Sequence, residues 1–330
     1  MSTDRTHTPV MAQEVREQLR IDSGAGLIID STLGEGGHSA LLLSDNPGAR
    51  IIGVDADPEM LERARVLLDD AAGRVEFVNC WFDEFWRAYD GPAPDRVLFD
   101  LGVSFYHFSG AGRGFSLRKD EPLDMRLSGS GRTAAELIEE LDEVEMADIL
   151  FRLGGERYSR RIAKAIVRER ADEGIRTSGR LAEVVRGAVP PAYRRGRNHP
   201  ATRTFQALRI AVNLELDRLR IALGFALDKL SVHGGRLAVI SFHSLEDRIV
   251  KWMFRRAAGM NVPEGSAGED SIIPEISPTN ETGGTAGEGS RFRIVTRKPL
   301  VPGESEAREN APSRSAKLRV VEKTLEEGGE

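Results

Sequence analysis

Residues 27–39 read Leu-Ile-Ile-Asp-Ser-Thr-Leu-Gly-Glu-Gly-Gly-His-Ser. An apolar run that ends in an acid, then a glycine-rich turn, then the apolar residues 40–43, is typical of a strand, a tight turn and a helix. In a doubly wound sheet this order opens a nucleotide site at the carboxyl edge of the strands, because glycine lets the backbone approach a ligand closely. We therefore expect the functional site to begin here.

Further strand patterns lie on both sides of a long interruption. Residues 51–55, 75–78 and 96–100 are short apolar segments, and residues 235–243 form a similar segment much later in the chain. Between the first two, residues 58–71 have helical spacing, with Asp57-Pro58 as a start signal. The pattern predicts a parallel α/β sheet that is split by an insertion.

The interruption has a helical character. Residues 102–131 are rich in glycine and charge, and residues 133–187 are periodic without strand patterns. A long helix with one apolar face between Phe205 and Leu219 then leads back to the sheet. We expect one domain from residues 1–109 and 200–330, and a mainly helical insertion at residues 110–199.

After the late strand, Ser244 to Asp247 resembles a capping box, which predicts a further helix. Residues 292–295 and 318–321 then read as edge strands. The stretch from 259 to 290 holds six acidic residues and no Lys or Arg, which accounts for the excess of 52 acidic over 46 basic residues. Its low apolar content predicts a disordered acidic loop, and the rest of the chain is balanced in charge.

Composition excludes several classes of protein. The 330 residues are 40% hydrophobic, which is enough for a sizeable core. Cys80 is the single cysteine, so an intrachain disulfide or a site of paired thiolates is excluded; we expect a buried small side chain and no metal site. No apolar run of membrane-spanning length or secretory leader occurs, which favours a soluble cytoplasmic protein.

The glycine turn favours one kind of ligand. It lacks the Gly-x-Gly-x-x-Gly order of dinucleotide enzymes and the Gly-Lys ending of phosphate loops. Asp55 follows Gly34 by 21 residues, where an acid can accept hydrogen bonds from a ribose diol. An adenosyl ligand without phosphates, such as S-adenosylmethionine, fits best. Asp100 ends the fourth strand, where a sheet of this type presents groups to the cofactor and the substrate.

An arginine-rich stretch suggests the partner. Residues 184–214 contain six arginines and a histidine but no acid. Guanidinium forks suit phosphate, and Tyr193 among them could stack on a base, so we favour RNA over a solvated face balanced by distant acids. The candidate contacts are Arg194, Arg195, Arg197 and Arg203.

Several longer motifs occur in one order and strongly resemble a single family, the bacterial 16S rRNA cytosine-N4 methyltransferases. The resemblance runs from about His7 to Lys323, apart from the acidic loop. Its motifs are residues 31–39, 113–116 (Arg-Gly-Phe-Ser), 122–126 (Pro-Leu-Asp-Met-Arg), 200–210 (Pro-Ala-Thr-Arg-Thr-Phe-Gln-Ala-Leu-Arg-Ile), 241–248 and 313–319.

The resemblance implies a class I, Rossmann-like methyltransferase sheet with a helical insertion that binds substrate. The implied reaction is transfer of a methyl group from S-adenosylmethionine to the N4 amine of a decoding-centre cytidine of 16S ribosomal RNA within the small subunit. Oligomeric state stays open. The family's cofactor contacts fall on Gly36, Gly37, His38, Asp55, Phe82 and Asp100, and a contact that is usually glutamine falls on His107.

The chemistry predicts a modest catalytic apparatus. The sulfonium methyl is already activated, so the enzyme must chiefly align the amine with it and accept a proton late. Asp100 is the first candidate acceptor and His243 the second. The alternatives are a methyltransferase for another RNA site or for protein, and a catalytically silent RNA-binding assembly protein, which the unusual segment Phe105 to His107 keeps open.

Overall fold

The computed structural model describes residues 8–109, 111–196, 198–262 and 290–325. The chain forms two compact units, the first from Met1–Gly102 and Leu216–Glu330 and the second from Val103–Glu215. These limits differ from the expected 109/110 and 199/200, because the helix at residues 202–213 packs on helices of the second unit. Most of the expected acidic loop at 259–290 lies outside the described residues.

A seven-stranded sheet forms the centre of the first unit, in the order β3-β2-β1-β4-β5-β7-β6. The first five strands in this order are parallel, and β7 runs antiparallel to both β5 and β6. The prediction that residues 318–321 form an edge strand is therefore wrong, since β7 is paired on both sides and β6 is the edge. The strands are β1 (Ala25–Asp30), β2 (Gly48–Asp55), β3 (Val75–Asn79), β4 (Arg96–Asp100), β5 (His233–Ser241), β6 (Ser290–Ile294) and β7 (Lys317–Leu325).

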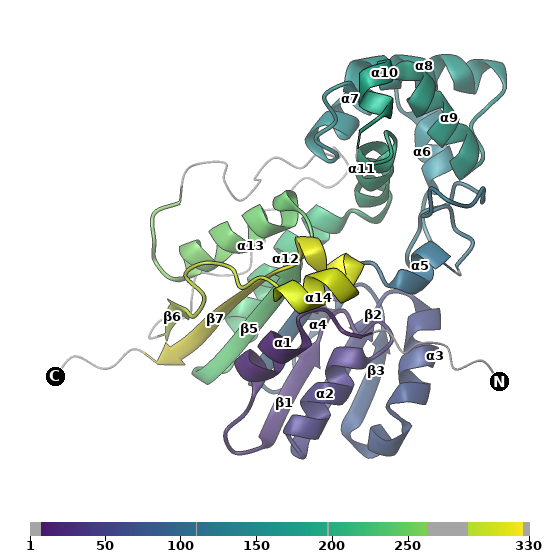
Figure 1. Ribbon diagram of the computed structural model, residues 1–330. Coiled ribbons are helices and arrows are strands. Elements are labelled where there is room, and N and C mark those ends of the chain that lie inside the picture. Colours follow the sequence, from purple (N-terminus) through teal and green to yellow (C-terminus); the bar gives the residue numbers. More distant parts are fainter. Residues whose placement is uncertain (1–7, 110, 197, 263–289, 326–330) are drawn as a thin grey trace. The chain divides into compact units, whose positions relative to one another are not determined.

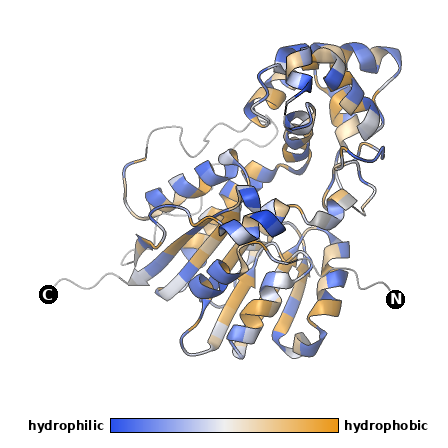
Figure 2. Ribbon diagram, in the orientation of Figure 1, coloured by the Kyte–Doolittle hydropathy of each residue, from blue (hydrophilic) through white to orange (hydrophobic). Residues whose placement is uncertain are grey.

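Helices cover both faces of this sheet (Figure 1). Consecutive strand residues point to opposite faces, so Leu98 joins the core cluster beneath the first helices whereas Phe99 meets the aromatic rings of α4. Figure 2 shows the parallel strands as predominantly hydrophobic, as burial on both faces requires, whereas β6 and β7 also carry charged residues. One face carries α1 (Ala12–Leu19), α2 (Gly37–Asp45) and α3 (Pro58–Leu67), and the other carries α4 (Phe82–Ala88), α12 (Glu215–Lys229) and α13 (Ser244–Ala257).

The second unit is helical, as predicted. Its core is built where α7 packs on α8 and α11, and where α8 packs on α6 and α9. No helix within the described ranges combines the length and apolarity needed to cross a membrane. The helices are α5 (Phe105–Ser109), α6 (Ala134–Glu140), α7 (Glu143–Arg152), α8 (Ser159–Asp172), α9 (Ser178–Ala188), α10 (Pro191–Arg194) and α11 (Thr202–Asn213); a short α14 (Glu304–Glu309) belongs to the first unit.

The single long helix expected between Phe205 and Leu219 is in fact two helices. Leu214 adopts a left-handed conformation with φ of 53°, which ends α11 before α12 begins. A left-handed leucine costs on the order of 1–2 kcal/mol, so the surrounding contacts must hold it in place. The break coincides with the limit between the two units.

The side chain of Asn213 supplies such contacts. It is buried, its Oδ1 accepts a hydrogen bond from the Leu127 amide at 2.9 Å, and its Nδ2 donates to the Met125 carbonyl at 2.8 Å. Met125 itself has a φ of 60°, so the amide stabilises a strained loop.

We expect Asn213→Ala to lower the free energy of unfolding by roughly 2–4 kcal/mol, because it leaves the buried Met125 carbonyl and the part-buried Leu127 amide without these partners. Urea unfolding followed by circular dichroism measures the change, with the exposed Asn198→Ala as the control. Equal stability of the two variants would contradict this bridging role.

A half-buried carboxyl, Asp228, and a buried lysine, Lys323, lie together in the first unit. Lys323 is buried in β7, and its Nζ donates to the backbone carbonyls of Leu227 and Asp228. Burial raises the pKa of the Asp228 carboxyl from 3.8 to about 6, although Lys323 and Lys229 oppose the shift. The charged carboxylate therefore destabilises the folded state, and this cost grows as the pH rises from about 3.8 to 6.

We expect Asp228→Asn to raise the melting temperature at pH 8, where the wild-type carboxyl is charged. The gain should shrink as the pH falls below 6 and be small near pH 4, because the folded carboxyl is then protonated and the unfolded one, with a pKa of 3.8, is partly protonated. Thermal unfolding at pH 4, 6 and 8 measures this, with the exposed Asp70→Asn as the control. A gain that is independent of pH would refute the assignment.

Candidate cofactor and active site

The turn between β1 and α2 is shaped by two glycines. Gly36 is the N-cap of α2 with φ of 84°, a conformation that favours glycine. A Cβ on Gly37 would lie 2.7 Å from the Pro9 ring, so a larger residue does not fit there. The turn thereby keeps its backbone close to the carboxyl edge of the sheet.

Asp55, at the end of β2, holds this turn. Its Oδ2 accepts a hydrogen bond from the Gly34 amide at 2.8 Å, and its Oδ1 accepts one from the Asp57 amide at 2.8 Å. Asp57 is the N-cap of α3, as predicted from the Asp-Pro pair. Each carboxylate oxygen has a second lone pair, so Asp55 can also accept hydrogen bonds from a diol.

The polar residues beneath the turn were not predicted as site residues, although Asp30, Ser31 and Ser39 lie within residues 27–39. Asp30 is buried, and its Oδ2 accepts a hydrogen bond from the Ser39 hydroxyl at 2.7 Å. Burial raises the pKa of Asp30, while the Ser39 hydrogen bond opposes the shift. The Ser31 hydroxyl accepts from the Trp86 indole at 3.0 Å and so ties the turn to α4.

Asp100 and His38 meet at the end of β4. The Asp100 amide donates to the Thr32 hydroxyl at 2.6 Å, which fixes the residue, and the Asp100 Oδ2 lies 3.5 Å from the His38 Nε2. Asp100 Oδ1 and both ring nitrogens of His38 are buried and have no hydrogen-bond partner in the described part of the chain. Buried polar atoms without protein partners require partners from outside the chain, and a bound ligand is one source of them.

Aromatic residues form the neighbouring wall. Phe82, at the start of α4, packs edge-to-face on Phe99 of β4, with ring centroids 5.8 Å apart. Cys80 just before it is half-buried rather than fully buried, and burial together with Glu84 and Asp83 raises the pKa of its thiol. A thiol held protonated in this way is a poor nucleophile.

These features fit an adenosyl ligand. The structure brings Gly36, Gly37, His38 and Asp100 to the carboxyl ends of β1 and β4, with Asp55 at the end of β2. Such a ligand presents a diol, ring nitrogens and an amino-acid group, all of which pair with carboxylates, imidazoles and backbone groups. The turn also lacks the lysine that would balance phosphate charge.

His243 is placed as a helix cap. Its Nδ1 accepts a hydrogen bond from the Glu246 amide at 3.4 Å, and its Nε2 lies 3.0 Å from the Glu246 Oε1. Glu246 also accepts from the amides of Phe242 and His243, which completes a capping box. The box therefore begins one residue earlier than predicted, because the histidine and not Ser244 caps the helix.

His107 belongs to the second unit, where it is buried with its ring 5.5 Å from that of Phe115.

Of the arginines proposed to bind RNA, Arg194 donates to the carbonyls of Val189 and Gly187 and so satisfies the end of α9. Arg195 and Arg203 are exposed, although Arg203 also donates to the Gly155 carbonyl. Arg197 lies outside the described residues.

Tyr193 is held by a buried acid. Its hydroxyl donates to Glu156 Oε2 at 2.7 Å, and Glu156 is fully buried. The ring packs edge-to-face on Tyr158 at 5.1 Å and lies beneath the Arg157 guanidinium at 5.0 Å. Burial and the contact with Glu156 raise the pKa of Tyr193. The two tyrosine rings thus form a packed aromatic pair beneath the Arg157 guanidinium.

Comparison with known proteins identifies the family. The model of the MraW methylase family matches residues 4–324. A protein of Treponema denticola named ribosomal RNA small subunit methyltransferase H is 44% identical over 96% of this chain and 97% of its own length. Proteins of the same name from Methylobacterium nodulans (43% identity, 98% and 92%) and Synechococcus elongatus (44% identity, 97% and 96%) are similarly related. The predicted family and class, an S-adenosylmethionine-dependent methyltransferase, are thereby confirmed, and the chain belongs to the MraW methylase family.

Proposed function

We propose that this protein transfers a methyl group from S-adenosylmethionine to the exocyclic N4 amine of a decoding-centre cytidine in 16S ribosomal RNA, in the cytoplasm. The relatives' shared name, ribosomal RNA small subunit methyltransferase H, supports the RNA and the subunit. The observation that carries the chemistry is the buried, unpartnered Oδ1 of Asp100 beside the unpartnered imidazole of His38.

S-adenosylmethionine supplies an electrophilic methyl group when it is bound. The glycine turn, Asp55 and His38 are the proposed cofactor contacts, with Phe82 as an apolar wall. The lone pair of the cytosine amine is delocalised into the ring, so an acceptor for its N–H helps to localise the pair on nitrogen. Asp100 Oδ1 is the proposed acceptor of that hydrogen bond and then of the proton; His243 is the second candidate.

The substrate base must leave its stack before it can reach such a site. We propose that the second unit, residues 103–215, binds the RNA, and we expect its exposed arginines to contact phosphates. Arg195 and Arg203 are better probes than Arg194, because the side chain of Arg194 completes the end of α9.

We expect Arg195→Ala with Arg203→Ala to weaken RNA binding about tenfold and to reduce the slope of log K against log salt by about 1.4, since each phosphate contact to a single strand contributes about 0.7. Affinity measurements at three salt concentrations test this. The control removes two exposed arginines from the outer side of α8, Arg161→Ala with Arg168→Ala. Equal losses in both variants would show a general charge effect.

The deciding experiment incubates the purified protein with S-adenosylmethionine and small subunits that lack the modification, followed by mass spectrometry of the RNA nucleosides. We expect N4-methylcytidine at one decoding-centre position. A parallel reaction with naked 16S RNA distinguishes the free RNA from the assembled subunit as substrate. Bound cofactor without methylation of either substrate would overturn the proposal in favour of another substrate or a silent assembly role.

A further inference from the structure

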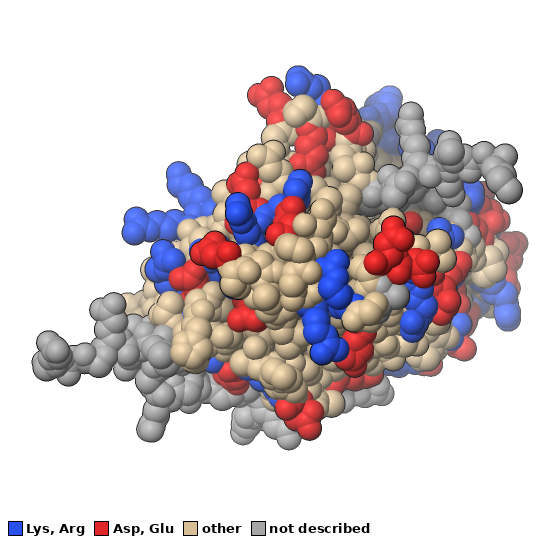
Figure 3. All heavy atoms as spheres, turned by 90° about the horizontal axis from the view of Figure 1, so that it is seen from below, with Lys and Arg blue, Asp and Glu red and all other residues tan. Residues whose placement is uncertain are grey.

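Cations are not gathered uniformly on the molecule. The face seen in Figure 3 mixes Lys and Arg with Asp and Glu, as expected from the balanced composition. A pocket in the first unit, between α13, β6 and β7, is different. It has a volume of about 560 Å³, and the described residues that line it include no acid. Five of those residues are cations: Lys251, Arg255, Arg293, Arg297 and Arg319.

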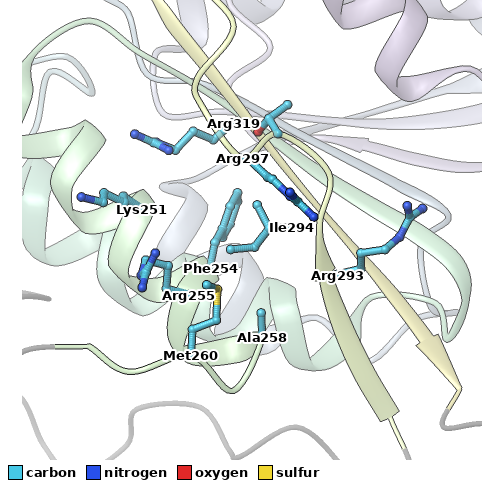
Figure 4. Close-up of a pocket in the computed structure, with 10 residues that line it drawn as sticks. Lys251, Phe254, Arg255, Ala258, Met260, Arg293, Ile294, Arg297 and Arg319 are labelled. Atoms are coloured by element: carbon cyan, nitrogen blue, oxygen red, sulfur yellow. The ribbon is translucent and has the colours of Figure 1, made fainter.

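We call this pocket the basic groove. Its lower wall is apolar. Figure 4 shows Phe254 and Ile294 side by side between α13 and the chain of β6, with Met260 and Ala258 below them. Phe254 is buried, whereas Met260 is 43% exposed. An apolar wall has a low dielectric constant, so it strengthens the attraction between an anion and the cations along its edge.

Two of the five cations are already neutralised. Arg319 binds Asp247 at 2.7 Å, and Arg293 binds Glu322 at 2.7 Å. Among the described residues no carboxylate lies within ion-pair distance of Lys251, Arg255 or Arg297. Counted over the described residues, the groove therefore keeps a net positive charge after its internal pairs are formed.

Arg255 makes the strongest case for a missing acceptor. Its Nε is buried and has no hydrogen-bond partner in the described ranges, while one terminal nitrogen makes a long contact of 3.4 Å with the Asn261 carbonyl. A buried guanidinium N–H without an acceptor is costly, and charge-assisted acceptors such as phosphate oxygens satisfy it best. A ligand that offers anionic oxygens would remove this cost.

We propose that this basic groove binds the phosphodiester backbone of an RNA strand, a contact surface separate from the arginine-rich stretch of the second unit. The inference rests on the proposed RNA methyltransferase function. Lys251 and Arg255 are one helical turn apart on α13, and Arg297 follows β6 on the other wall, so the unpaired cations are spread over two elements (Figure 4). This spread suits successive phosphates of a strand better than one small anion.

The chain contains its own reporter. Trp252 lies beneath both cations of the helix, with Lys251 Nζ 4.1 Å and the Arg255 guanidinium 5.5 Å from the ring centroid. Occupation of the groove should draw these cations towards phosphate and change the fluorescence of Trp252. Trp252→Phe identifies its share of the signal from the three tryptophans.

The test compares two double variants with equal loss of charge. Lys251→Ala with Arg297→Ala removes groove cations, and Arg248→Ala with Lys298→Ala removes exposed cations outside the pocket lining from the same helix and connection. Their affinities for a twelve-nucleotide RNA of adenine and uracil are measured at three salt concentrations. We expect the groove variant to bind about tenfold more weakly with a slope reduced by about 1.4, and the control to change less than twofold. The fluorescence response should be lost in the groove variant and kept in the control.

Equal losses in both variants, or none in the groove variant, would overturn the inference. The inference would also fail if millimolar inorganic phosphate gave the same fluorescence response as the RNA, because that indicates a site for a small anion. It would fail as well if an acidic peptide gave the response and the RNA did not. The oligonucleotide has no cytosine, so its binding does not depend on methylation. If the wild-type protein methylates subunits but the groove variant binds the oligonucleotide normally, only this inference fails. If oligonucleotide binding depends on the groove but the wild-type protein does not methylate subunits, only the proposed function fails.

Discussion

Replacing Asp100 with asparagine is expected to lower kcat by about 10²- to 10⁴-fold, the range that a positioned proton acceptor contributes. Asparagine keeps the size of the side chain and one oxygen, but it cannot take up a proton. The hydrogen bond between the Asp100 amide and Thr32 involves only the backbone of residue 100, so the turn should keep its conformation. Single-turnover methylation at saturating cofactor measures the effect.

A second carboxylate, next to the opposite end of the same strand, provides the control. Asp95 lies before the amino end of β4, where its Oδ2 accepts a hydrogen bond from the Leu27 amide. Asp95→Asn should leave turnover within about twofold, because that end of the strand is remote from the carboxyl edge. Unchanged turnover in Asp100→Asn would eliminate Asp100 as the acceptor, and the same assay on His243→Ala, with unfolding measured alongside, would then test the second candidate.

Replacing Asp55 with alanine should weaken binding of S-adenosylhomocysteine by about 100-fold, which corresponds to roughly 2.7 kcal/mol. Two losses add in this variant. The Gly34 and Asp57 amides lose their acceptor, so the glycine turn is no longer held, and the proposed hydrogen bonds to the ribose diol disappear. Calorimetric titration measures the affinity.

A thermodynamic cycle separates these two losses. The 2′,3′-dideoxy analogue of S-adenosylhomocysteine lacks the diol, so wild type should prefer the natural ligand while Asp55→Ala should lose most of that preference. Asp57→Ala is the structural control, since it removes the cap of α3 and should retain the preference. A preference that survives in Asp55→Ala would mean that Asp55 only shapes the turn.

Most of the sheet could be predicted because its strands are short apolar runs with acids or glycine at their ends. The break at Leu214 could not, since the apolar periodicity of residues 205–219 continues through it and leucine carries no signal for a left-handed conformation. The contacts that hold the break come from Asn213 to residues 125 and 127, a long-range interaction with no local pattern. For the same reason the later limit between the units lies at 215/216 and not at the expected 199/200.

The site was predictable where function depends on consecutive residues, as in the glycine turn and the strand-ending acids Asp55 and Asp100. Side-chain roles that depend on tertiary partners were not. His243 was not recognised as a cap, because histidine is unusual there and its role depends on Glu246. The basic groove joins Lys251, Arg297 and Arg319, which sequence order keeps far apart.

The interior place of β7 governs when this chain can finish folding during synthesis. Arg96 of β4 pairs with Arg236 of β5, and translation at about 5–20 residues per second separates these residues by about 7–28 s. Helices of the intervening unit contact near neighbours in sequence and can form during that interval. The strand between β5 and β6 is made last, and its Leu318 and Val320 complete the core cluster. A nascent chain that has not yet released residues 317–325 therefore exposes an apolar sheet edge, and a chain truncated before them keeps it exposed permanently.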